Sequence, residues 1–85
     1  MNELELNRLR WRSRRGLLEL DLLLLPFFDE EFHSLDDATQ QTYVRLLEEE
    51  DPDLLSWFSR KSNSEDPKID ALIQLMLKRV QPVAD

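Results

Sequence analysis

The clearest hydrophobic pattern in the sequence lies in the last part of the chain. Apolar residues recur there every three or four positions, a spacing that places them on one face of an α-helix. They are Ile69, Leu72, Ile73, Met76, Leu77 and Val80. Asp66 can cap this helix directly before a proline at its first position, and Pro82 is expected to end it. The pattern predicts a helix from residue 67 to about residue 80.

The N-terminal part of the chain predicts two more helices. The first covers residues 3–14 and the second runs from about Gly16 towards Pro26. The residues of the first helix that we expect to face inward are Leu4, Leu9 and Trp11. The second segment is apolar on almost every side, which is typical of a helix that is either central to the core or shared between the core and a partner. Pro26 is expected to kink this helix or to begin a fresh turn.

The middle of the chain carries two further helix starts. Ser34 is expected to cap a helix that has Asp37 at its third position and ends near Glu50. Asp51-Pro52 then opens a short helix with an acidic cap before a proline. Residues 59–65 are polar and without periodicity, which predicts a loop. Because no strand alternation or hairpin turn competes with these segments, the predicted fold class is all-α. We expect a compact bundle of about five helices, with residues 1–85 forming a single domain.

Composition excludes several classes of function. The 85 residues include no cysteine and one histidine, so disulfides, thiol chemistry and the usual zinc sites are not expected. A formal charge of -7 argues against nucleic-acid binding, which needs a basic surface. No apolar stretch is long enough to insert into a membrane. One glycine cannot build a phosphate loop, and the acidic clusters lack the spacing of a calcium loop. We therefore expect no enzyme activity, no metal and no cofactor of its own.

The charge is distributed unevenly, which changes this picture. Residues 1–15 carry five arginines and two glutamates, a balance of +3, whereas residues 16–59 carry twelve acidic residues and one arginine, a balance of -11. The remaining segment, residues 60–85, has a balance of +1. A basic end beside an acidic middle favours a polarised surface that binds another protein. The alternative is that the charges only keep a small domain soluble.

The only glycine of the chain, Gly16, stands beside two arginines in an otherwise helical sequence. Glycine inside a helix costs about 1 kcal/mol relative to alanine, so its presence needs a reason. Either the chain turns at Gly16, or the surface of another molecule approaches the bare backbone there. On a continuous helix, Arg15 and Glu19 would share a face, where an exposed pair adds only about 0.3–0.5 kcal/mol to stability. The pair therefore makes more sense as a binding device around Gly16.

Several short motifs around this glycine resemble those of one family. They are Trp11, Arg14-Arg15-Gly16-Leu17-Leu18-Glu19-Leu20-Asp21 and Pro26-Phe27-Phe28, followed by Leu46-Leu47-Glu48, Asp51-Pro52-Asp53-Leu54 and Trp57. Together they cover roughly residues 8–58. In these blocks the chain resembles the succinate dehydrogenase assembly factors, the flavinylation factors called SdhE in bacteria. The fold of that family is a small all-helical bundle.

The resemblance implies an assembly chaperone for a flavoprotein. Members of the family bind the flavoprotein subunit of succinate dehydrogenase, and in bacteria that of fumarate reductase, and promote covalent attachment of FAD to a histidine of that subunit. Carried over by position, Arg15, Gly16 and Glu19 are expected to contact the flavoprotein near its flavin. The neighbours that we expect on the same surface are Arg14, Asp21, Pro26 and Phe27. The factor is expected to be monomeric when free and to act in the bacterial cytoplasm.

Other interpretations of the same residues stay open at this point. The acidic residues 29–53 would suit an antitoxin-like or regulatory protein that masks a basic surface, and a small enzyme is a third hypothesis. Gly16 would serve equally well as a hinge between two helices. Trp11, Phe28 and Trp57 are expected in the core, because aromatic side chains contribute large buried areas. No dinucleotide-binding motif is present, so we predict no tight binding of free FAD.

Overall fold

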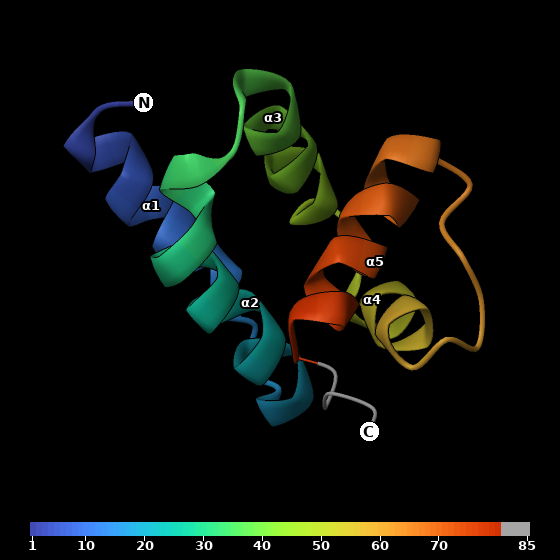
Figure 1. Cartoon of the computed structure of the whole chain (residues 1–85). Coiled ribbons are helices and arrows are strands. Elements are labelled where there is room, and N and C mark those ends of the chain that lie inside the picture. The colour runs from blue at the N-terminus through green and yellow to red at the C-terminus, as the bar shows by residue number, and fades with distance from the viewer. Residues whose placement is uncertain (81–85) are drawn as a thin grey trace.

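Five α-helices and one turn of 3-10 helix form the described part of the computed structural model, residues 1–80. Their bounds are α1 Glu3–Ser13, α2 Leu18–Glu31, η1 Phe32–Ser34, α3 Asp37–Leu46, α4 Asp51–Phe58 and α5 Pro67–Val80. Figure 1 shows α1 and α2 on one side of the molecule, while α3 and α4 pack against α5 on the other. The predicted all-α class and the compact bundle of about five helices are confirmed.

The core is built around a group of aromatic side chains at its centre. Phe28 and Phe32 stack with ring centroids 4.8 Å apart, and Tyr43 packs against both rings. The Tyr43 hydroxyl lies 2.7 Å from the hydroxyl of Ser13, which also donates to the Leu9 carbonyl of α1. Burial raises the pKa of Tyr43 to about 12. This contact ties α1 to α3 across the core.

The helix with the strongest pattern folds as predicted. Five of the six apolar residues of its stripe are buried in α5, and only Val80, at the end of the helix, is exposed. The Asp66 carboxylate accepts hydrogen bonds from the backbone N–H groups of Lys68 at 2.9 Å and Ile69 at 3.5 Å, so it caps the helix as expected. Residues 59–65 form turns and bends, which confirms the predicted loop. The expected stop at Pro82 lies outside the described residues.

One helix extends further than predicted, and one predicted helix start was wrong. Helix α2 continues through Pro26 to Glu31, although proline removes one backbone hydrogen bond. Phe27 and Phe28, directly after the proline, are buried, and this packing outweighs the local cost. The predicted cap Ser34 belongs to η1 instead, and Asp36 caps α3 by accepting a 2.8 Å hydrogen bond from the N–H of Thr39.

The inward face of α1 also differs from the expectation. Leu9 is buried as predicted, but Leu4 is exposed and Trp11 is 73% exposed. Leu9 and Ser13 lie one turn apart and both face the core. Trp11 lies two positions from each of them, about 200° around the helix, and therefore points to solvent. Phe28 is buried as predicted, and Trp57 is partly buried against the core.

Candidate functional site

The connection between α1 and α2 is a tight turn centred on Gly16. Residues 14–17 are not helical, and Gly16 has a φ of +83°. Residues other than glycine rarely adopt this left-handed backbone conformation, so the turn itself requires the glycine. A Cβ atom built on Gly16 would meet no other atom within 4 Å. The residue is therefore a hinge, and it also leaves bare, open backbone at the surface.

Arg15, directly before this glycine, directs its guanidinium into the molecule. Its Nε donates to the Asp51 carboxylate at 2.7 Å, and its two terminal nitrogens donate to the carbonyls of Leu47 and Glu49, both at 2.8 Å. Its backbone N–H donates to the Asp21 carboxylate at 2.7 Å. The side chain is 17% exposed and that of Asp51 is 32% exposed. These hydrogen bonds hold the turn against the connection between α3 and α4 and against the first residue of α4.

These contacts correct two expectations about the charged residues. Arg15 and Glu19 do not share a helix face, because Gly16 separates Arg15 from the start of α2. Glu19 lies exposed in the first turn of α2, whereas the Arg15 side chain binds the segment 47–51. Asp51 does not cap α4 as predicted: the N-cap residue is Glu50, without a side-chain bond, while the Asp51 carboxylate accepts from Arg15.

The other predicted site residues divide between the surface and the interior. Arg14 is exposed beside the turn, and Asp21 and Pro26 are half-buried on α2. Phe27 is only 2% exposed and stacks on Tyr43 with ring centroids 6.0 Å apart. Its predicted place on a contact surface is therefore corrected, since the side chain offers a partner almost no accessible area.

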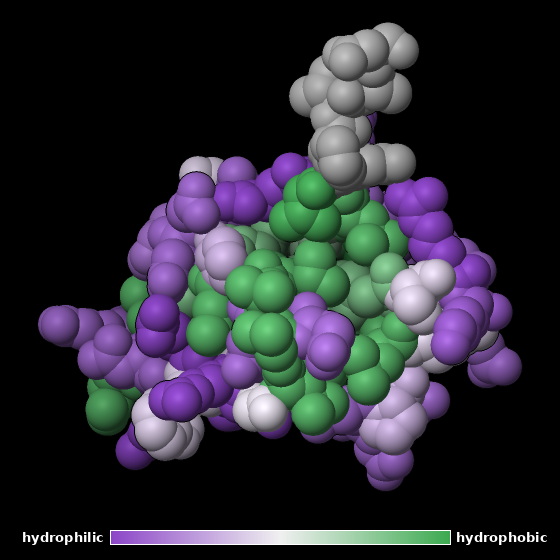
Figure 2. Space-filling model, turned by 90° about the horizontal axis from the view of Figure 1, so that it is seen from below, coloured by the Kyte–Doolittle hydropathy of each residue, from purple (hydrophilic) through white to green (hydrophobic). Residues whose placement is uncertain are grey.

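The structure brings two unpredicted apolar side chains to this turn. Trp11 lines a hollow of about 240 Å³ together with Arg14, Arg15 and Gly16, and Leu18, at the start of α2, is 68% exposed. The turn lies at the bottom of Figure 1, and Figure 2 shows hydrophobic side chains gathered in the middle of the face seen from below. Leu18 belongs to α2, whose apolar residues cover almost every side, and Leu18 and Leu22 of that helix are exposed. Trp11 lies on α1, and the sequence carried no such signal for it.

We call this region the turn surface and define it by five exposed residues. They are Trp11, Arg14, Gly16, Leu18 and Glu19. It combines aromatic and aliphatic area with one basic and one acidic side chain around open backbone. Large exposed apolar side chains beside charged groups are typical of protein-binding surfaces.

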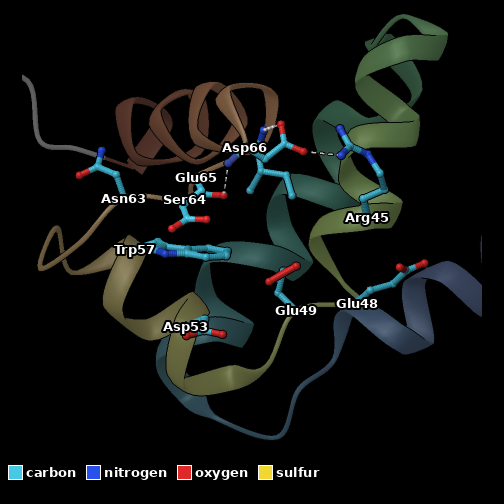
Figure 3. A pocket seen from close by; sticks show the side chains of 10 residues that line it. Arg45, Glu48, Glu49, Asp53, Trp57, Asn63, Ser64, Glu65 and Asp66 are labelled. Carbon is cyan, nitrogen blue, oxygen red and sulfur yellow. Dashed lines mark hydrogen bonds and ion pairs between the residues drawn. The ribbon is translucent and has the colours of Figure 1, made fainter.

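A second hollow, of about 530 Å³, lies in the acidic part of the molecule (Figure 3). It is lined by Arg45, Glu48, Glu49, Asp53, Trp57, Asn63, Ser64, Glu65, Asp66 and Ile69. Arg45 forms an ion pair with Asp66, and this hydrogen bond holds the pKa of the Asp66 carboxyl below its usual range. In residues 1–80 no group of three or more metal-ligating side chains is close enough to hold a metal ion. This acidic hollow is the surface on which the antitoxin-like alternative would depend.

The described helices contain none that is both long and apolar enough to cross a membrane.

Comparisons with known proteins show a match along most of the chain. The model of a family described as "Flavinator of succinate dehydrogenase" matches residues 7–80. A Pseudomonas putida protein named "FAD assembly factor SdhE" is 48% identical over 82 residues, which cover 96% of this chain and 98% of that protein. Proteins of the same name from Pseudomonas aeruginosa and Yersinia pestis are 46% identical over 81 residues and 39% identical over 72 residues. The first covers 95% of this chain and 96% of the relative, and the second covers 85% and 82%.

Proposed function

This chain belongs to the family of flavinators of succinate dehydrogenase, and we propose that it binds the flavoprotein subunit of that enzyme and promotes covalent attachment of FAD to it. The relatives are named as assembly factors, which supports a role beside the enzyme and not as the catalyst. The same role toward the flavoprotein of fumarate reductase is part of the proposal. The relatives compared above are bacterial, which supports a bacterial setting, and action in the cytoplasm is part of the proposal.

The single observation that carries the proposed contact is the combination of open backbone and exposed side chains at the turn surface. The space on the Cβ side of Gly16 is open to 4 Å, so the main chain of a partner can approach it closely. Trp11 and Leu18 offer apolar area that a partner would bury. Aromatic anchors such as Trp11 contribute most of the energy of many interfaces. Glu19 supplies a carboxylate that can accept charged hydrogen bonds from the partner.

The proposed contribution of the chain is to hold a shape and not to react. The bond between flavin and flavoprotein forms between groups that both belong to the partner. A rigid surface that binds one arrangement of the flavoprotein better than others raises the population of that arrangement. The compact bundle, with its turn tied to a second connection by Arg15, suits this task.

The test compares two charge reversals of exposed glutamates on the two candidate surfaces. We expect Glu19→Lys to weaken binding of the flavoprotein subunit by roughly 10–100-fold, because a hydrogen bond to a charged group contributes about 1.5–3 kcal/mol. Glu48→Lys, on the acidic hollow, is the matched control and should change the affinity by less than about twofold. Covalent flavin on the denatured subunit, measured by its fluorescence, should follow the binding.

Two outcomes would contradict the proposal. If Glu19→Lys supports binding and flavin attachment at the normal level, the turn surface is not the contact. If Glu48→Lys abolishes the binding of the natural partner while Glu19→Lys does not, the acidic regulatory alternative is correct. Circular dichroism of both variants ensures that folded proteins are compared.

A further inference from the structure

Every nitrogen of the Arg15 guanidinium is hydrogen-bonded within the chain. Each of its three nitrogens donates a hydrogen bond of 2.7 or 2.8 Å, and every acceptor belongs to the segment 47–51. A planar guanidinium with a carboxylate on one side and two carbonyls on the other is a geometry that lysine cannot reproduce. These bonds are short and mostly shielded from water, so they hold the guanidinium against its own chain.

These bonds join two connections that are far apart in the sequence. Arg15 belongs to the turn between α1 and α2, and its acceptors belong to the connection between α3 and α4 and to the first residue of α4, 32 to 36 residues away. The backbone of Arg15 is held as well, because its N–H donates to the Asp21 carboxylate. Leu17 packs against the core beside this turn, and the polar contacts of Arg15 fix the backbone directly before Gly16.

We propose that Arg15 and Asp51 are positioning residues, which fix the turn surface in the shape that binds the flavoprotein without contacting the flavoprotein themselves. The inference rests on the proposed function. It changes the role of the arginine within the Arg-Gly-x-x-Glu motif, which consists of Arg15, Gly16 and Glu19 in this chain. Glu19 and the bare backbone of Gly16 face the partner, whereas Arg15 faces its own chain. Asp51, outside that motif, becomes as important for binding as Arg15.

The physical reason is preorganisation of the turn. A turn with a glycine at its centre has many conformations open to it, and binding must select one of them. When only a fraction of molecules holds the competent turn, the apparent affinity falls by that fraction. We call the hydrogen bonds from the Arg15 guanidinium to Leu47, Glu49 and Asp51 the clamp. Loss of the clamp should therefore weaken binding, while the rate of flavin attachment at saturating factor stays unchanged.

The test compares alanine substitutions of two acids in the first turn of α4. Asp51→Ala removes the acceptor of the Arg15 bond, whereas Asp53→Ala removes the same charge from the same helix turn without touching the clamp. We expect Asp51→Ala and Arg15→Ala each to weaken flavoprotein binding by about tenfold or more, and Asp53→Ala by less than about twofold. Arg15→Lys, which keeps the charge but not the fork, should also weaken binding.

Amide hydrogen exchange of the free protein separates positioning from general stability. In the Asp51→Ala and Arg15→Ala variants, the amides of residues 14 and 15, whose N–H groups are hydrogen-bonded in the turn, should exchange at least about tenfold faster, while those in the middle of α5 keep their protection. Faster exchange throughout α5 would mean that the clamp serves only overall stability, and would overturn the proposal. The milder Asp51→Asn variant allows the same comparison if the alanine variant does not fold.

The binding results distinguish this inference from the proposed function. If Arg15→Ala loses binding while Asp51→Ala retains it, Arg15 contacts the partner directly and the inference is wrong. If the unaltered chain does not bind the flavoprotein subunit at all, the proposed function is wrong. The exchange experiment on the free protein then still decides whether the clamp holds the turn.

Discussion

Substitutions of Gly16 can separate the conformation of the turn from the approach of a partner. Alanine and asparagine differ at this position in two opposite ways, in side-chain size and in tolerance of a positive φ. Alanine adds one methyl group but is strained at a φ of +83°, whereas asparagine is larger and tolerates the left-handed region better. The two variants should therefore rank differently in stability and in binding if both properties depend on Gly16.

The expected stabilities of the two Gly16 variants follow from the backbone conformation alone. A Cβ atom would meet nothing within 4 Å, so no packing clash adds to the cost in the free protein. Left-handed backbone costs an L-residue about 1–2 kcal/mol, and reduced freedom of the unfolded chain returns about 0.4–1 kcal/mol. We expect Gly16→Ala to lose about 1 kcal/mol, which lowers the Tm of a domain of this size by about 4–8 °C. Gly16→Asn should lose less.

The affinities of the two variants for the flavoprotein should have the opposite order to their stabilities. If the main chain of the flavoprotein packs against Gly16, any side chain there separates the two surfaces, and the larger one does so more. Gly16→Asn should then bind more weakly than Gly16→Ala, although it is the more stable protein. Isothermal titration with the flavoprotein subunit and thermal unfolding of the free variants measure the two orders.

One result would refute the reasoning. If affinity follows stability, so that Gly16→Asn binds better than Gly16→Ala, the glycine is required only by the turn and no partner approaches it. The bare backbone would then be a consequence of chain geometry, and Trp11, Leu18 and Glu19 alone would form the contact.

Two further predictions concern other parts of the molecule. Trp11→Ala should weaken flavoprotein binding by at least about tenfold in the same titration, as expected for an aromatic anchor, with stability within about 0.5 kcal/mol because the side chain is 73% exposed; unchanged affinity would remove Trp11 from the turn surface. Burial raises the pKa of Tyr43 to about 12, so the neutral hydroxyl favours the folded state below pH 10, and this stability is lost as the pH rises from about 10 to 12. Urea unfolding at pH 7 and pH 11 should show a larger loss for the unaltered chain than for Tyr43→Phe, and equal losses would contradict the predicted burial effect.

Most of the fold could be predicted because its determinants are local. The α5 stripe and the cap of Asp66 lie within a few residues of each other, and both formed as the sequence indicated. The errors arose where distant packing outweighs local preference. Pro26 lies inside α2 because Phe27 and Phe28 hold the following turn in the core, and those aromatic contacts come partly from α3.

The site could be predicted in place but not in detail. Gly16 was recognised because a single glycine in a helical chain is visible without any structure. The partner of Arg15 was not, since Asp51 lies 36 residues away and its position before a proline suggested only a helix cap. Trp11 was assigned to the core by residue type, whereas the burial of Leu9 and Ser13 fixes the orientation of α1 and directs Trp11 to solvent.

The four-residue spacing of Arg15 and Glu19 suggested a shared role, and the structure separates their roles. Because Gly16 reverses the backbone between them, the arginine faces inward and the glutamate faces outward. The two residues then depend on each other without touching: Glu19 can meet a partner in a fixed orientation only if Arg15 and Asp51 hold the turn that precedes α2. A short motif can therefore encode both a contact and the support for that contact. It follows that loss of binding on substitution of Arg15 does not by itself place this side chain at the interface.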